Sequence, residues 1–343
     1  MKTKVTVQDI ADCLHLSRIT VSKALNNSPN VSEETREMVL RKAREMNYKS
    51  VPYSALSDEP PDTGQSKSFA FVMQMNPDAF HIGSGIMAQL EQEIRKKGYS
   101  LTLHTITEQD ISSMSLPANL NENKVAAAIC LEMFHPEYSR LICSLGIPVL
   151  FIDACVHFRS LRPRSDLLLM ENRSSVHKML TAVYEKHPFS TMGFVGDIDH
   201  CLSFRERYEG FLLAAVSCGI ETQPYHMIAP DRHYGEPGWM LRQLQNMEKL
   251  PDLFCCANDA LAQMLIQNLR DFGRRVPEDV MVCGFDGISF MNPAMNCLTT
   301  VNIPCRELGA CAARLLFQRM PVPDKIHTVT YVETEICLRN TTR

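Results

Sequence analysis

Short apolar runs alternate with helical segments through most of the chain, and this alternation restricts the possible folds more than any other feature. The runs have the length and apolar character of buried strands, and segments with a helical apolar stripe, such as residues 86–97, separate them. Repeated strand–helix units favour parallel sheets covered by helices. The runs are FAFVMQM, YSLTLHTI, VAAAICLEM, IPVLFID, LLLM, TMGFVGD, LFCCAND and VMVCGFDG.

These units form two series, one starting at Phe69 and the other near Leu167. Two series in one chain predict two similar α/β lobes. Ligands of such sheets bind beyond the carboxyl ends of the strands, so we expect a binding cleft between the lobes.

Residues 6–26 have the pattern of two short helices joined by a tight turn, with Ser17 as a natural N-cap for the second helix. The outward positions of that helix are small and polar or cationic, which suits contacts with phosphates and base edges. A helix-turn-helix lays such a helix in the DNA major groove, whereas the alternative is an ordinary helical hairpin. The outward residues are Arg18, Thr20, Ser22, Lys23 and Asn26.

A third helix is predicted after Ser32, which can act as its cap, and its apolar stripe is Val39, Ala43 and Met46. Residues 1–50 carry nine Lys or Arg and six Asp or Glu, although the whole chain of 343 residues has a net charge of −4. A basic head on an acidic body fits a small DNA-contacting module attached to a body with another task.

The thirteen cysteines form no C-x-x-C pair, and the adjacent Cys255 and Cys256 suit neither an ordinary disulfide nor a zinc site. We therefore expect reduced cysteines and a cytoplasmic, nucleoid-associated protein. No apolar run approaches the length of a membrane span. The chain also has no G-x-S-x-G, P-loop or metal-spaced His pair, and the G-x-G at residues 83–85 is a weak nucleotide signal. We expect no enzyme activity, cofactor, metal or membrane partner.

The head sequence T-V-Q-D-I-A-D…S-R-I-T-V-S-K-A-L-N…V-S-E-E-T-R-E-M-V-L…A-R-E-M-N-Y resembles the head of the lactose/galactose repressor (LacI/GalR) family of bacterial transcription factors. In the body, R-Y-E-G-F, C-A-N-D and V-P-E-D-V-M-V-C-G-F-D-G resemble the same family and, through it, the periplasmic sugar-binding fold. The resemblance implies an all-α helix-turn-helix head and a two-lobed, type I periplasmic-binding-protein-like α/β core with parallel sheets. His15 stands where the family usually has Gly, and we expect it to accept a left-handed backbone.

The resemblance also implies a domain organisation. It comprises a DNA-binding domain at 1–50, a hinge or linker at 51–68 and an effector-binding and dimerisation core at 69–343. In the family a leucine of the hinge wedges into the minor groove, and Leu56 is the candidate here, although no Arg stands beside it and acids follow closely. The expected lobes are about 69–163 with 291–321, and about 164–290 with 322–343.

Residues of the second helix match the family's DNA contacts. Arg18, Ile19 and Lys23 match base-reading positions, where Ile19 can offer only apolar contact, for instance with a thymine methyl group. Thr20 and Ser22 match phosphate-contacting positions. The candidate DNA-binding residues are Ser17, Arg18, Ile19, Thr20, Ser22, Lys23, Asn26 and Leu56.

Candidate effector residues follow the strands of the body. Arg207 matches a ligand-binding arginine, Asn258 follows one strand and Asp286 another, while Asp259 is expected to cap the next helix. Gly287 stands where the family usually has a second acid. The full set is Arg207, Asn258, Asp286, Asp153, His233, Tyr234, Asp78 and Phe80, with His81 and Asn172 as weaker candidates.

Four of these candidates have an alternative role. His233 or Tyr234 could stack on a sugar ring, or both could be plain loop residues. Asp153 could contact ligand or merely end its strand, and Asn172 could contact ligand or merely hold its lobe together.

Together these features predict a repressor that binds a near-palindromic operator as a homodimer, because one head contacts too few bases for useful specificity. A sugar or sugar derivative between the lobes would control it. A regulator of the same fold controlled by a protein partner, or by no ligand, is the alternative. A solute-binding protein is a further one.

Overall fold

The computed structural model describes two compact units, Met1–Gln65 and Ser66–Arg343. Only the backbone is described for Leu25 and for residues 80–82. The described residues are 6–25, 31–32, 35, 38–39, 41–43, 46, 68–74, 80–117, 120, 124–158, 164–222, 225–287 and 297–343.

The first unit begins with helix α1, Val7–Leu14. A capping box between Thr6 and Asp9 opens it, which satisfies backbone N–H groups of the first turn. The helix ends at His15, whose backbone is left-handed with φ 53° and ψ 38°. The prediction that His15 accepts this conformation in place of Gly is confirmed.

Helix α2, Arg18–Leu25, follows the turn and is capped as predicted, because Ser17 Oγ accepts a hydrogen bond from the backbone N–H of Thr20 at 3.0 Å. Later in this unit Ser32 Oγ accepts from the backbone N–H of Thr35 at 3.3 Å. Residues 38–39 and 41–43 are helical. The buried core of the unit comprises Ile10, Ala11, Val21, Ala24, Val39 and Ala43.

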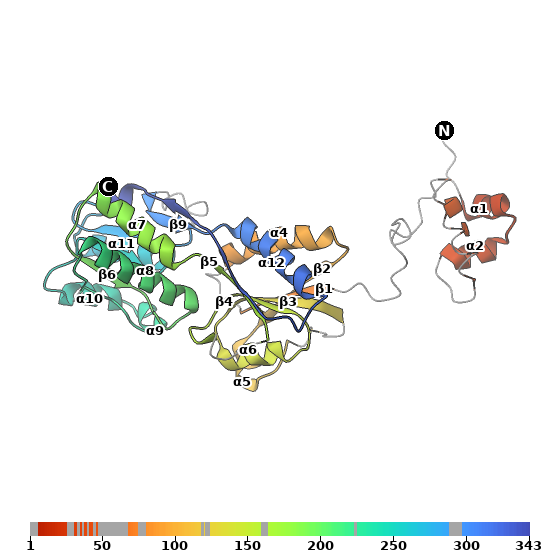
Figure 1. The fold of residues 1–343 in the computed structure, drawn as a ribbon, viewed down its shortest axis with the longest axis horizontal. Coiled ribbons are helices and arrows are strands. Elements are labelled where there is room, and N and C mark those ends of the chain that lie inside the picture. Colours follow the sequence, from red (N-terminus) through yellow and green to blue (C-terminus); the bar gives the residue numbers. More distant parts are fainter. Residues whose placement is uncertain are drawn as a thin grey trace. The chain divides into compact units, whose positions relative to one another are not determined.

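The second unit contains a six-stranded parallel sheet in the order β10-β5-β4-β3-β1-β2. Helices α4 and α12 cover one face of it, and α5 and α6 cover the other (Figure 1). Its strands are β1 Ser68–Gln74, β2 Ser100–Ile106, β3 Val125–Met133, β4 Val149–Ala154, β5 Asp166–Met170 and β10 Val329–Val332. Its helices are α4 Phe80–Arg95, α5 Glu108–Ser113, α6 Pro136–Cys143 and α12 Cys305–Arg319.

A second, smaller sheet has the parallel order β6-β7-β8, and β9 joins β8 through single bridges and pairs with β11 in the antiparallel sense. The strands are β6 Met192–Val195, β7 Leu253–Cys256, β8 Met281–Cys283, β9 Thr300–Asn302 and β11 Glu335–Cys337. The helices are α7 Arg173–Lys186, α8 Leu202–Cys218, α9 Asp231–Tyr234, α10 Trp239–Asn246, α11 Asp259–Asp271 and the 3₁₀ helix η7 Asn340–Thr342.

Strand β5 differs from the expectation. The pattern assigns the LLLM run to the second lobe, whereas β5 pairs with β4 and so extends the first sheet, with Asp166 opposite Leu150. A buried ion pair ties it there, because Arg319 of α12 donates to both Asp166 carboxylate oxygens at 2.8 and 2.7 Å. The sequence-based assignment of this strand is therefore wrong.

Three short crossings connect the two sheets and their helices. Each has two residues between regular elements: Glu171 and Asn172 between β5 and α7, Ile303 and Pro304 between β9 and α12, and Glu333 and Thr334 between β10 and β11. Asn172 is completely buried.

Candidate functional site

Arg207, on α8, reaches the carboxyl ends of the second sheet and is only 4% exposed. Its Nε donates to Asn172 Oδ1 at 3.0 Å, and its Nη1 donates to the Ala257 carbonyl at 2.7 Å and to Asp286 Oδ1 at 3.3 Å. The guanidinium also lies 3.7 Å from the centroid of the Phe285 ring. The guanidinium is therefore held on several sides.

The close packing of α8 depends on Gly210. A Cβ there would lie 2.3 Å from the backbone oxygen of Arg173, so a larger residue would push α8 away from α7. This glycine, in the R-Y-E-G-F motif, thus fixes how deeply Arg207 enters the site.

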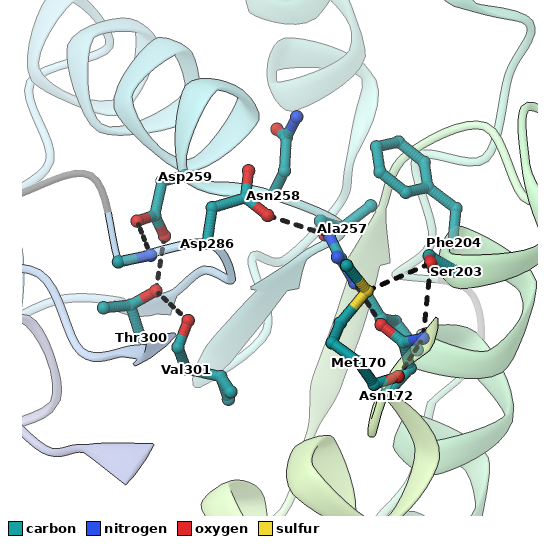
Figure 2. A network of polar contacts seen from close by, with 12 residues as sticks. Met170, Asn172, Ser203, Phe204, Ala257, Asn258, Asp259, Asp286, Thr300 and Val301 are labelled. Carbon is teal, nitrogen blue, oxygen red and sulfur yellow. Dashed lines mark hydrogen bonds and ion pairs between the residues drawn. The ribbon is translucent and has the colours of Figure 1, made fainter. Parts of the chain in front are cut away.

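Asp286 follows β8 and takes a backbone φ of 125°, which is unusual for a residue with a side chain. Burial raises the pKa of its carboxyl to about 8, with Arg207 lowering it and the charges of Asp259 and Glu132 raising it further. Figure 2 shows the Asp286 carboxylate next to Asn258, pointing toward Ala257 and the group around Asn172 and Ser203. Arg207 and Asp286, predicted as ligand contacts, therefore do lie together.

The cap of α11 is Asn258 and not Asp259, which we predict from the sequence to cap this helix. Asn258 is the N-cap of α11, since its Oδ1 accepts from the backbone N–H of Leu261 at 2.9 Å. Asp259 is buried and does not cap the helix. It accepts from Thr300 Oγ1 at 2.6 Å and from the backbone N–H of Gly287 at 2.9 Å, which joins β9 to the end of β8 (Figure 2).

Gly287, where the family usually has a second acid, has a left-handed φ of 75°. A Cβ at this position would lie 2.3 Å from Asn302 Oδ1. The local packing therefore accounts for the glycine, and the site has one acid here where the family has two.

The first sheet contributes two acids to this region, Glu132 of β3 and Asp153 of β4. Leu131 pairs with Ile152 and Met133 with Ala154, which leaves Glu132 and Asp153 opposite each other. Both have left-handed backbones, with φ of 52° and 58°.

Asp153 Oδ1 accepts from the backbone N–H groups of Ala154 at 2.8 Å and Ser203 at 3.3 Å, and so links β4 to α8. Glu132 is a residue that the sequence-based list misses. Burial raises the pKa of its carboxyl to about 7, with Asp153 raising it further and His200 and Arg207 lowering it. The sequence signal that could have identified Glu132 is its position as the lone acid inside the apolar run VAAAICLEM.

His200 is a second residue that the list misses. Its ring lies against Phe134, next to β3, and Phe204 of α8, with centroids 4.7 and 4.9 Å away. Burial favours a lower pKa for His200, but the hydrogen bond and charge of Asp231 outweigh it, so the pKa is raised.

The two aromatic candidates have different positions. His233 stacks on Trp239 with centroids 5.8 Å apart and its Nδ1 lies 2.8 Å from Glu236 Oε1. Tyr234 is buried, and its hydroxyl donates to the Met227 carbonyl. Its ring offers no open face for stacking, so that prediction is wrong.

Some predicted residues are not described. Asp78, Asn26 and Leu56 lie outside the described residues, and for Phe80 and His81 only the backbone at the start of α4 is described. Asn172 links the end of β5 to α8, since its Nδ2 donates to the Met170 carbonyl at 2.9 Å and to Glu206 Oε2 at 3.1 Å.

On helix α2, Val21 and Ala24 are buried in the core of the head, and the predicted contact residues lie on the other side of the helix. Arg18 and Lys23 are exposed, and Ile19 is 68% exposed, which is high for an isoleucine. Thr20 and Ser22 are half-buried. The exposed isoleucine stands beside a cation on a polar surface, where an apolar base contact would cover it.

The part of the chain that the structure describes also contains a pocket away from the Arg207–Asp286 group. A pocket of about 510 Å³ lies apart from Asp286, between α7, α8 and β10, and its lining includes Glu171, Glu206, Leu213 and Tyr331. No three described His, Cys, Asp or Glu side chains gather as a metal site, and no described helix has the length and apolar character to cross a membrane.

Comparison with known proteins agrees with this architecture. Residues 6–50 match the family "Bacterial regulatory proteins, lacI family", and residues 183–342 match the "Periplasmic binding protein-like domain". The head of the chain is that of the lacI family of bacterial regulatory proteins. The family resemblance seen in the sequence is thereby confirmed, as is the expectation of a regulator and not an enzyme.

Relatives of this regulator cover nearly its whole length. The transcriptional repressor PurR of Aliivibrio salmonicida is 24% identical over 326 residues, which are 94% of this chain and 93% of PurR. The ribose operon repressor of Halalkalibacterium halodurans is 24% identical over 345 residues, 98% of this chain and 97% of that repressor.

Solved structures support the same fold. The lac repressor bound to ONPG in the repressed state has a TM-score of 0.66 at 19% identity, covering 99% of this chain and 100% of that one. The CelR–cellobiose complex has a TM-score of 0.64 at 21% identity, covering 98% and 99%. The predicted fold class is confirmed.

Proposed function

We propose that this regulator is a transcriptional repressor that binds a near-palindromic operator as a homodimer. A small polar metabolite, a sugar or sugar derivative, would bind between the lobes and change operator affinity. The observation that carries the proposal is the coexistence of an outward polar helix α2 with the Arg207–Asp286 group at the strand ends of the body. Since its target is DNA, we place the protein in the cytoplasm.

DNA contact is proposed for Ser17, Arg18, Ile19, Thr20, Ser22, Lys23, Asn26 and Leu56. The cationic and hydroxyl groups of α2 suit phosphates and guanine edges. We assign residues 1–50 to the DNA-binding domain, 51–68 to the hinge and 69–343 to the core. A dimer is proposed because a single short helix reads too few base pairs.

Effector contact is proposed for Arg207, Asp286, Asn258, Asp153 and His233, with Asp78 and Phe80 from the first lobe. Support comes from the position of Asp286, Asn258 and Asp153 at strand or helix ends, and from the contact of Arg207 with Asp286. It also comes from the ligands of similar structures, such as cellobiose in the CelR complex. Arg207 already contacts both Asn172, in a crossing between the lobes, and Asp286, so a ligand there would act on both.

The test is selection of operator DNA by the full-length chain from a random duplex pool, followed by titration at several salt concentrations. We expect a two-fold symmetric consensus, a 2:1 protein-to-duplex ratio by mass measurement, and affinity that falls steeply with salt. Recovery of no consensus, or affinity independent of salt, would contradict DNA binding by α2.

Control by a metabolite is tested separately, by thermal unfolding with small molecules. A chain that binds operator but responds to no small molecule would favour control by a protein partner instead.

A further inference from the structure

Several charged groups that the structure describes around the proposed effector site have a partner. Arg207 is paired with Asp286, and His200 with Asp231. Asp153 accepts two backbone N–H groups. Glu132 accepts no hydrogen bond from any residue that the structure describes.

The backbone conformation of Glu132 is nevertheless energetically unfavourable for a residue with a side chain. Left-handed backbone is uncommon for a residue with a side chain, and it persists only where surrounding structure imposes it, often at binding sites. Glu132 and Asp153, opposite each other on neighbouring strands, both have it. The first sheet thus ends in two acids that face Arg207 and His200 of the second lobe.

Arg207 already makes three hydrogen bonds within the chain. Arg207 uses Nε for Asn172 and Nη1 for Ala257 and Asp286. An anionic ligand would be repelled by the charge of Asp153 and by that of ionised Glu132, which lie opposite each other at the end of the first sheet. A ligand that donates hydrogen bonds would instead satisfy the carboxylate of Glu132.

We propose that Glu132 contacts the effector directly, and that the site selects a ligand rich in hydrogen-bond donors without negative charge, such as a polyol or amino sugar, against sugar phosphates. This inference rests on the proposed function, because it assumes that a small molecule binds between the lobes. The family resemblance alone allows both neutral sugars and sugar phosphates as ligands, and this inference excludes the sugar phosphates.

The charge of the ligand can be tested before the ligand is identified. The probe is the low-molecular-mass fraction of a bacterial cell extract, divided on a strong anion exchanger at pH 8 into unretained and salt-eluted material. Thermal unfolding of the full-length chain is measured with each desalted part. We expect stabilisation by the unretained part, and stabilisation by the salt-eluted part alone would overturn the inference while leaving the proposed function intact.

The role of Glu132 is tested with the active part and the variant Glu132→Gln. The amide keeps the shape but cannot offer two charged acceptor oxygens, so the concentration for half-maximal stabilisation should rise at least about tenfold. Glu108→Gln, at an exposed position on α5, is the matched control and should respond like the wild type. An unchanged response of Glu132→Gln would overturn the assignment.

One outcome separates this inference from the proposed function. If neither part of the extract stabilises the wild type, control by a small molecule fails, and the inference fails with it. Operator binding would then still be judged by DNA selection alone.

Discussion

The substitution Glu132→Gln should change the pH dependence of stability even without ligand. The pKa of Glu132 is raised from 4.5 to about 7 in the folded chain. Between these values the folded state holds a proton that the unfolded state has lost. The free energy of unfolding of the wild type should therefore fall as pH rises through this range, and the fall should level off above pH 7.

The magnitude follows from the same shift. Each pKa unit corresponds to about 1.4 kcal/mol, so the raised pKa of Glu132 can cost up to about 3 kcal/mol at pH 8. Glutamine does not titrate and removes this cost. The variant should match the wild type near pH 5 and be more stable at pH 8 by up to about 3 kcal/mol, or roughly 5 °C in Tm.

The assay is urea unfolding of wild type, Glu132→Gln and the exposed control Glu108→Gln at pH 5, 6, 7 and 8. Removing the charge of Glu132 also lowers the pKa of Asp286, which adds to the gain of the variant at high pH. A stability difference that is the same at every pH would refute the reasoning, because it would mean that Glu132 titrates alike in both states.

Four other predictions concern separate parts of the molecule. Arg18→Ala should relax operator preference at one base step by about 1–3 kcal/mol, read from a selected-site profile, and an unchanged profile would refute the contact. Asp286→Ala should abolish the thermal response to effector while operator affinity stays within about threefold; a retained response would remove Asp286 from the site. Asp166→Asn leaves Arg319 buried without its charge partner and should cost about 3–5 kcal/mol in urea unfolding at pH 7, whereas a loss below about 1 kcal/mol would mean that the pair adds little. Gly287→Asp, which introduces the family's second acid, should destabilise by at least about 1–3 kcal/mol because of the left-handed φ and the contact with Asn302, and wild-type stability would contradict that packing argument.

Much of the fold was predictable because its determinants are local. Helix α8 and strand β7 follow from periodicity and apolar runs, and the caps at Ser17 and Ser32 follow from residue type. Strand β5 was assigned to the wrong lobe because its sheet membership depends on a partner far along the chain. The ion pair between Asp166 and Arg319 joins residues that no local pattern connects.

In the candidate site, too, local patterns predict some features and distant partners decide others. Arg207 and Asp286 come together as the motifs predict. Asn258 and Asp259 could not be told apart, since both side chains can cap a helix and only the position of Thr300 draws Asp259 away. The hydrogen bond from the Tyr234 hydroxyl to the Met227 carbonyl could not be predicted, because Met227 lies in an irregular segment. Without that bond, Tyr234 is a candidate for stacking on a ligand.

The three crossings between the lobes have a mechanical consequence. Two extended residues reach only about 7 Å, so the lobes cannot separate by translation and must pivot. The six crossing residues offer about eleven soft backbone torsions, since Pro304 has a fixed φ. Asn172 is one of the six, and it accepts directly from Arg207. A ligand that reorients the Arg207 guanidinium would therefore act directly on a residue of the crossing about which the lobes rotate. The change would not have to pass through the core of either lobe.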